Sequence, residues 1–243
     1  MRVIQWILEQ IFPTRCAGCG IVAPDGICER CREQLPFVEE DACPKCGRGA
    51  AKCLCGKRYT TAEGNEVTFH FSPQYQQLVA PCYYTGAMRR GIALLKFHGQ
   101  KRHALWMGRE MARSLQKQMV LSQIDLVVPV PLSRSRLRER GYNQAVLLAR
   151  EVAGILELPF SEQVLIKTKD NAVQHTLSHR QRLLNVEGVY AVQGELSGKC
   201  LLLIDDVSTS GATLSSCGQA LYSAGAEAVV CCVAAVTVRR EDE

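Results

Sequence analysis

Apolar runs alternate with amphipathic stretches along the last two thirds of the chain. Hydrophobic residues recur three and four positions apart, the spacing of helices with one buried face, over residues 88–97, 105–115, 143–156 and 213–224. Short continuous apolar runs separate these helices, over residues 78–84, 124–130, 199–204 and 228–236. Strands that are apolar on both faces are typical of parallel sheets. The pattern therefore predicts an α/β fold, a parallel sheet with helices on both faces.

The N-terminal part has a different pattern. Residues 3–12 form an apolar run that is interrupted by glutamine and glutamate, so it is too short and too polar for a membrane span or a signal peptide. We interpret this run as an amphipathic helix with Trp6, Ile7 and Ile11 facing the core. We expect no membrane insertion and a cytoplasmic protein.

A polar, glycine-containing stretch over residues 57–72 is typical of a linker. It divides the chain into an N-terminal module, residues 1–60, and a main domain, residues 75–243. Composition excludes few classes of protein. The chain is 47% hydrophobic and 22% charged, as ordinary globular proteins are, and its net charge of +5 permits an anionic partner such as a nucleotide or DNA without requiring one.

Cysteines set the N-terminal module apart. Eight of the thirteen lie in four close pairs, CAGC, CERC, CPKC and CLC, at positions Cys16, Cys19, Cys28, Cys31, Cys43, Cys46, Cys53 and Cys55. Two residues between thiolates let both sulfurs reach one Zn²⁺ ion at ~2.3 Å, and four thiolates close a tetrahedral site. Gly20 and Gly47 follow two of the pairs, where a tight turn favours positive φ. Reduced or disulfide-linked cysteines are the alternative.

We therefore expect two structural zinc ions and no catalytic one, because a site with four thiolates has no open position. The module has too few residues between its cysteines for a core, so metal binding would supply its folding energy. Sequential pairing, with the first four cysteines on one ion and the last four on the other, is the arrangement we favour. Interleaved pairing stays open at this point.

The stretch LLLIDDVSTSGATL, residues 201–214, carries the clearest chemistry of the main domain. Four apolar residues lead directly into Asp205 and Asp206, and a loop of small residues then opens a predicted helix. In open parallel sheets, ligands bind beyond the carboxyl ends of the strands. Backbone N–H groups and a helix N-terminus suit a phosphate group, here at Thr209, Ser210, Gly211, Ala212 and Thr213. The carboxylates suit a sugar diol or its Mg²⁺, so a ribose 5-phosphate fits both. The alternative is a capped Asp-Asp turn with no ligand.

A second loop follows the strand at residues 124–130. It begins with Pro131, Leu132, Ser133 and Arg134, and continues with Arg136, Arg138 and Arg140. Guanidinium groups bind phosphate oxygens in bidentate fashion, so four arginines beside a phosphate site suit a pyrophosphate. A solvated basic loop and contacts to nucleic-acid phosphates are the two alternatives.

Four motifs together carry a family resemblance. Residues 201–214 resemble the signature of type I phosphoribosyltransferases that binds 5-phosphoribosyl 1-pyrophosphate (PRPP). VPVPLSRSRLRERGYNQAVLLA (residues 128–149), the eight cysteines and residues 167–188 resemble the ComF/GntX family, although Lys167 and Ala172 stand where Arg and Thr are more usual. The resemblance implies a phosphoribosyltransferase fold, Mg²⁺ with PRPP, a pyrophosphate loop at residues 131–134, and a role in DNA uptake during natural transformation or in the use of DNA as nutrient.

Two functions remain open. In the first, the protein is an enzyme in which Asp205 and Asp206 orient the ribose, residues 209–213 hold the 5-phosphate, and residues 168–182 form a hood over an unknown acceptor. In the second, it is an adaptor that keeps the PRPP pocket and binds single-stranded DNA or a competence helicase. Aromatic residues within basic runs are sparse in the main domain, so stacking on bases is not evident from the sequence.

Overall fold

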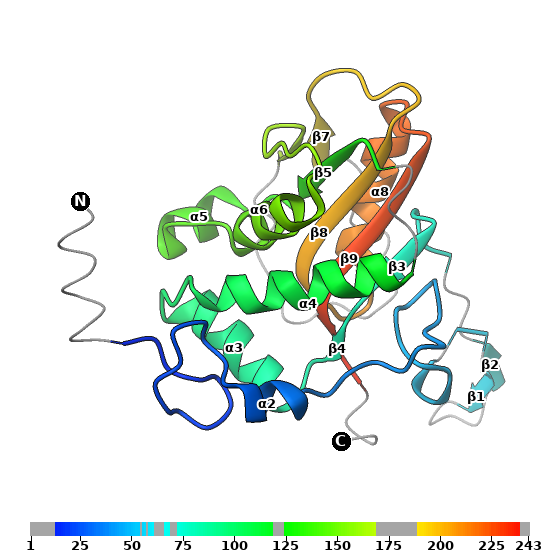
Figure 1. The fold of residues 1–243 in the computed structure, drawn as a ribbon. Helices are drawn as coiled ribbons and strands as arrows, with labels where there is room; N and C mark the ends of the chain where they lie inside the picture. Colours follow the sequence, from blue (N-terminus) through cyan, green and yellow to red (C-terminus); the bar gives the residue numbers. More distant parts are fainter. Residues whose placement is uncertain are drawn as a thin grey trace.

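The computed structural model describes residues 13–53, 55–56, 58–60, 66–68, 72–118, 124–168 and 189–238 (Figure 1). The helix expected over residues 3–12 lies outside this part, and so does almost all of the expected hood over residues 168–182. Among the described residues, no helix is long and apolar enough to cross a membrane.

A parallel sheet forms the centre of the molecule. Its strands are β3 (Gln77–Val79), β4 (Cys82–Tyr83), β5 (Leu126–Pro129), β8 (Cys200–Ser208) and β9 (Ala228–Val236). The order is β3-β9-β8-β5, β4 also pairs with β9, and every pairing is parallel. Every residue of β9 is buried, as expected for the apolar run that predicted this strand.

Helices cover both faces of this sheet (Figure 1). One face packs against α3 (Gly86–Phe97), α4 (His103–Lys117) and α6 (Gln144–Leu156), and the other against α8 (Ala212–Ser223). Alternate residues of β8 serve the two cores: Leu202 and Ile204 join the first, Leu201 and Leu203 the second. The predicted fold class is therefore confirmed.

Several expected boundaries are wrong for local reasons. The single strand expected over residues 78–84 is two strands, because Pro81 has no N–H to donate to a ladder. The stretch expected as a linker contains a short antiparallel pair, β1 (Arg58–Thr60) and β2 (Glu66–Thr68). A second antiparallel pair, β6 (Leu165–Lys167) and β7 (Tyr190–Val192), was not expected.

The strand expected to end at Ile204 continues through the acidic pair to Ser208. Its neighbour β5 ends at Pro129, opposite Ile204, whereas β9 runs on and pairs with Asp205, Val207 and Ser208. The carboxylates therefore lie on a strand that has lost one neighbour, at the edge where the loop after β5 begins.

The cysteine-rich part consists mostly of turns, with α2 (Glu29–Glu33) and the 3-10 turn η1 (Ala50–Lys52). Six of its buried residues belong to the same hydrophobic cluster as α3, α4 and α6: Cys16, Ala17, Ala23, Ile27, Cys31 and Leu35. Arg90 of α3 fixes the first turn by donating to the carbonyls of Ala17 and Gly18, each at 2.7 Å. The chain between the two cysteine groups adds an antiparallel bridge from Phe37 to Cys82. The module thus packs closely on the sheet domain, and the boundaries at residues 60 and 75 stay a prediction.

Candidate functional site

The eight paired cysteines form two groups in sequential order. Cys16, Cys19, Cys28 and Cys31 make one, Cys43, Cys46, Cys53 and Cys55 the other, and within each group the sulfurs lie within 4.8 Å of one another. The Sγ distances are 3.7 Å for Cys16–Cys28 and 3.6 Å for Cys46–Cys53. Four sulfurs at ~2.3 Å from one ion form a tetrahedron with edges of about 3.8 Å, so both groups fit zinc.

The turns beside these cysteines have the geometry that zinc knuckles need. Gly20 and Gly47 adopt φ values of +78° and +68°, the left-handed conformation predicted for them. All eight predicted ligands are thus brought together, in the sequential pairing rather than the interleaved one. The sites are structural, because four thiolates leave no coordination position for a substrate.

The acidic pair of β8 is divided between the two faces of the sheet. Side chains alternate along a strand, so Asp206 lies on the face of Ile204 and Asp205 on the face of Leu203. Asp206 is only 3% exposed, so the two carboxylates do not lie together in one solvated crevice. Asp205 is partly exposed, and one of its oxygens accepts the Asp206 backbone N–H at 2.8 Å.

Asp206 forms an ion pair that the sequence did not reveal. Its Oδ1 lies 2.7 Å from Nζ of Lys96, in the last turn of α3. Its other oxygen, Oδ2, is buried and has no hydrogen-bond partner among the described residues. A buried carboxylate oxygen without a donor costs free energy, and a metal-bound water, a sugar hydroxyl or Mg²⁺ would relieve that cost.

Asp205 has a different electrostatic environment. Burial, and next the neighbouring Asp206 carboxylate, raise the pKa of Asp205 to about 7, against the opposing effect of Lys96 and Lys167. A carboxyl group with this pKa is poised to lose its proton when a cation binds beside it. The lysine that departs from the usual family pattern, Lys167, is therefore close enough to influence the acidic pair.

The loop after β8 has the shape of an anion site. Gly211 has a φ of +75° and is buried at the N-terminus of α8, a conformation that residues with a Cβ rarely adopt. The twelve-residue helix α8 begins at Ala212, whose N–H is bonded to the Ser210 hydroxyl at 3.4 Å. Thr209 and Thr213 are exposed. The five predicted phosphate-binding residues thus form one tight turn at a helix N-terminus.

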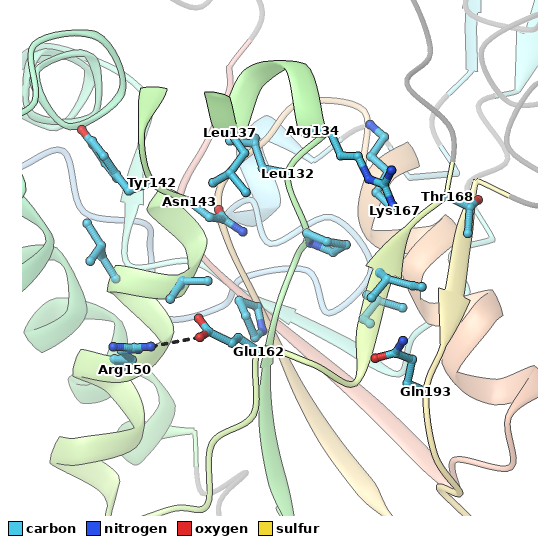
Figure 2. Close-up of a pocket in the computed structure, with 16 residues that line it drawn as sticks. Leu132, Arg134, Leu137, Tyr142, Asn143, Arg150, Glu162, Lys167, Thr168 and Gln193 are labelled. Carbon is cyan, nitrogen blue, oxygen red and sulfur yellow. Dashed lines mark hydrogen bonds and ion pairs between the residues drawn. The ribbon is translucent and has the colours of Figure 1, made fainter. Parts of the chain in front are cut away.

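The predicted pyrophosphate loop borders a pocket of about 810 Å³ (Figure 2). The loop begins beside Ile204, the residue before the acidic pair, because the Val130 N–H is bonded to the Ile204 carbonyl at 2.8 Å. The described residues that line the pocket include neither the acidic pair nor residues 209–213. Pro131, Leu132 and Arg134 line the pocket, opposite Lys167 and Thr168 at the end of β6. Ser133 instead is buried and caps the following helix, accepting the Arg136 N–H at 3.4 Å.

The four arginines of this region do not face one ligand. They lie on a helix, α5 (Arg134–Arg140), and not in an extended loop. At 100° per residue, positions two apart point to nearly opposite sides of a helix, so Arg134 and Arg136 diverge. Only Arg134 of the four is among the described residues that line the pocket. The expectation that all four hold pyrophosphate is therefore wrong.

Both the cysteine-rich part and the sheet domain are similar to known proteins. Residues 7–63 match the model of the double zinc ribbon domain, and residues 142–243 match that of the phosphoribosyl transferase domain. Competence protein F of Haemophilus influenzae is 27% identical over 238 residues, which cover 91% of this chain and 96% of that protein. The chain therefore has a double zinc ribbon domain and a phosphoribosyl transferase domain, and it is a homologue of a competence protein.

Two other relatives are also similar over most of this chain. The DNA utilization protein YhgH of Escherichia coli K12 is 28% identical over 217 residues, which cover 84% of this chain and 87% of the relative. Competence protein ComFC of Bacillus subtilis is 28% identical over 212 residues, covering 86% of this chain and 84% of the relative. The similarity therefore includes both the cysteine-rich part and the sheet domain.

Sequence reasoning missed the two lysines beside the acidic pair. Lys96 lies in the sequence ALLKFHG, where nothing distinguishes it from any lysine at the end of an amphipathic helix. Lys167 stands at a motif position where arginine is more usual, and this substitution of one cation for another could have identified it as a charged group of the site. Both residues reach Asp205 or Asp206 only through tertiary packing.

Proposed function

We propose that this protein belongs to the ComF/GntX family, binds Mg²⁺-PRPP at the carboxyl end of β8 and acts in the uptake or use of DNA. The observation that carries the proposal is a juxtaposition: the acidic pair, the turn over residues 209–213 and the loop after β5 meet at one edge of a parallel sheet. Ligands of open α/β sheets bind at such an edge.

Each part of PRPP has a matching group. The turn over residues 209–213 would hold the 5-phosphate with backbone N–H groups and hydroxyls. Asp205 and the unpartnered oxygen of Asp206 would hold the ribose hydroxyls or a hydrated Mg²⁺. Pro131, Leu132 and Arg134 would border the pyrophosphate, with Lys167 across the pocket.

The enzyme hypothesis follows from this placement. Magnesium, when bound with PRPP, would neutralise the departing pyrophosphate, and the protein's own residues would orient the ribose for attack. Because Asp205 has a raised pKa, it would be deprotonated as the cation arrives. No residue of the described chain is assigned as a base for the acceptor.

Titration calorimetry with Mg²⁺-PRPP tests the binding proposal. We expect a one-to-one complex in the full chain, and about tenfold weaker binding for Asp205→Asn, since a charge-assisted hydrogen bond contributes ~1.5–3 kcal/mol. Unchanged affinity in the Asp205→Asn/Asp206→Asn double variant would mean that the carboxylates take no part in binding PRPP. Pyrophosphate release with a panel of nucleobases then separates turnover from binding alone.

One observation favours DNA binding as a second function. Phe97 is 70% exposed, and the Arg140 guanidinium lies 5.3 Å from its ring centre. Beside it, Lys101 lies 4.7 Å from the ring of Tyr142. An exposed aromatic ring among cations, here Phe97, suits a stacked base and the backbone phosphates of a single strand. The structure thus supplies the aromatic group that the sequence did not make evident.

Fluorescence anisotropy with a labelled oligonucleotide tests this second function. We expect Phe97→Ala to weaken binding of single-stranded DNA without changing PRPP affinity, and Arg138→Ala to reduce the salt dependence of binding. Ile155→Ala, which removes an exposed apolar side chain of α6 that does not line the pocket, is the control. If wild type and the three variants bound the oligonucleotide equally well, DNA binding at this surface would be excluded. An adaptor function would then require a protein partner.

A further inference from the structure

The second cysteine group lies directly against the sheet. In its first turn, residues 43–48, the Pro44 carbonyl accepts the Leu78 N–H and the Lys45 carbonyl accepts the Tyr75 hydroxyl, both at 2.8 Å. Gly47 packs so closely that a Cβ there would lie 3.1 Å from a Leu78 side-chain carbon and 3.3 Å from one of Val236. The turn is therefore fixed relative to β3 and to the end of β9.

Arg48, the last residue of this turn, joins it to the proposed phosphate loop. Its Nη2 donates to the Thr209 carbonyl at 2.8 Å, and its Nε donates to the Thr237 carbonyl at 2.7 Å. Its own carbonyl accepts the N–H of the zinc ligand Cys43 at 2.7 Å. One half-buried guanidinium thus connects a zinc knuckle, the end of β8 and the end of β9.

The bond to Thr209 determines how the loop presents its next amide. A trans peptide is planar, so the Ser210 N–H points opposite to the Thr209 carbonyl. Because Arg48 holds that carbonyl on the side of the zinc knuckle, the Ser210 N–H is directed away from the knuckle. A preorganised N–H group binds an anion more tightly than a mobile one, since no ordering entropy is lost on binding.

We propose that Arg48 is a positioning residue that makes PRPP affinity depend on the metal in the second cysteine site. This inference rests on the proposed function. Without a metal, no ion ties the turn at residues 43–48 to Cys53 and Cys55, and the turn keeps only its contacts with the sheet. The knuckle would then hold Arg48 less firmly, and the anchor that Arg48 gives to the loop over residues 209–213 would weaken.

The experiment compares full-length proteins. Arg48→Ala removes the bridge, Cys53→Ser removes one ligand of the second site, and Arg48→Lys retains the charge without the fork of donors. Arg30→Ala is the matched control, because Arg30 is an exposed arginine beside a ligand of the first site. Each protein is assayed for zinc content, for Mg²⁺-PRPP affinity by calorimetry, and for amide hydrogen exchange without PRPP.

Two amides report on the loop in the exchange experiment. The Ser215 N–H is bonded to Gly211 at 2.9 Å and the Thr237 N–H to Ser208 at 3.1 Å. We expect faster exchange of both in Arg48→Ala and Cys53→Ser, with PRPP affinity reduced about tenfold and no further loss when the two changes are combined. Arg48→Ala should keep two zinc ions, Arg48→Lys should be intermediate, and Arg30→Ala should match wild type.

The coupling would be overturned if Arg48→Ala had the same amide exchange rates and the same PRPP affinity as Arg30→Ala. An additive loss in the combined variant would also overturn it, since the two changes would then act independently. Failure of the proposed function gives a different result: wild type would not bind Mg²⁺-PRPP at all, while the exchange of Ser215 and Thr237, measured without ligand, would still respond to Arg48→Ala.

Discussion

The ion pair between Lys96 and Asp206 leads to an asymmetric prediction for protein stability. The side chain of Asp206 is 5% exposed and that of Lys96 is 20% exposed, at an N–O distance of 2.7 Å. Lys96→Met would leave a buried carboxylate with neither oxygen paired, since Oδ2 already lacks a partner. Removing one partner of a buried pair costs ~3–5 kcal/mol, so we expect a loss in this range.

Asp206→Asn should cost less, about 1–2 kcal/mol. The amide keeps the shape of the side chain, the unpaired oxygen no longer carries charge, and the partly exposed ammonium group of Lys96 can turn toward water. The double variant Asp206→Asn/Lys96→Met should be more stable than the sum of the single losses predicts, by about 1–2 kcal/mol, because it leaves no isolated charge.

Urea unfolding followed by tryptophan fluorescence measures these values. Trp106 is 1% exposed in the core beneath α3, so its emission reports on loss of this packing. The m-value should stay constant, so that a shift of the midpoint reflects stability alone. Equal losses for the two single variants, or simple additivity in the double variant, would refute the reasoning from a buried ion pair.

Three further predictions concern the acidic pair, the loop and the metal. Asp205→Asn should flatten the pH dependence of stability. The folded pKa of Asp205, about 7, lies above the reference value of 3.8, so wild-type stability should fall as pH rises between these two values. Urea titrations of both proteins at pH 5 and pH 8 measure the difference. Gly211→Val should weaken Mg²⁺-PRPP binding at least tenfold by calorimetry, because a β-branched residue is strained at a φ of +75°; wild-type affinity would contradict this. Metal analysis of protein purified without chelator should find two zinc ions per chain, and fewer than one would exclude the zinc-ribbon assignment.

The sequence predicted those features that depend on near neighbours. Ligand spacing within a C-x-x-C pair is local, so all eight cysteines were found, and Gly47 was correctly assigned positive φ. The strand, turn and helix around Gly211 are likewise contiguous in sequence. What escaped prediction depends on contacts between distant segments: the end of β8, which β9 extends past Ile204, and the bond between Arg48 and Thr209, which are 161 residues apart.

Alternation along β8 also changed the interpretation of the acidic pair. Adjacent carboxylates in a loop can converge on one ligand, which is the arrangement that the motif suggested. On a strand they point to opposite faces, and here one face is closed by Lys96. The two aspartates therefore have different environments: Asp205 is partly exposed, whereas Asp206 pairs with Lys96 of α3 and keeps a buried oxygen without a hydrogen-bond partner among the described residues.

The packing of the zinc sites bears on how loss of metal should be understood. The first site contributes Cys16 and Cys31 to the cluster that contains Trp106, and the second fixes Arg48 between the ends of β8 and β9. A metal ligand can thus affect the sheet domain by two separate routes, one through the core and one through the loop. Cys16 is 4% exposed and lies within the core that the module shares with the sheet domain. Cys16→Ser should therefore unfold the module and also lower the stability of the sheet domain. Under the proposed coupling, zinc would stabilise the same edge of the sheet at which we place PRPP.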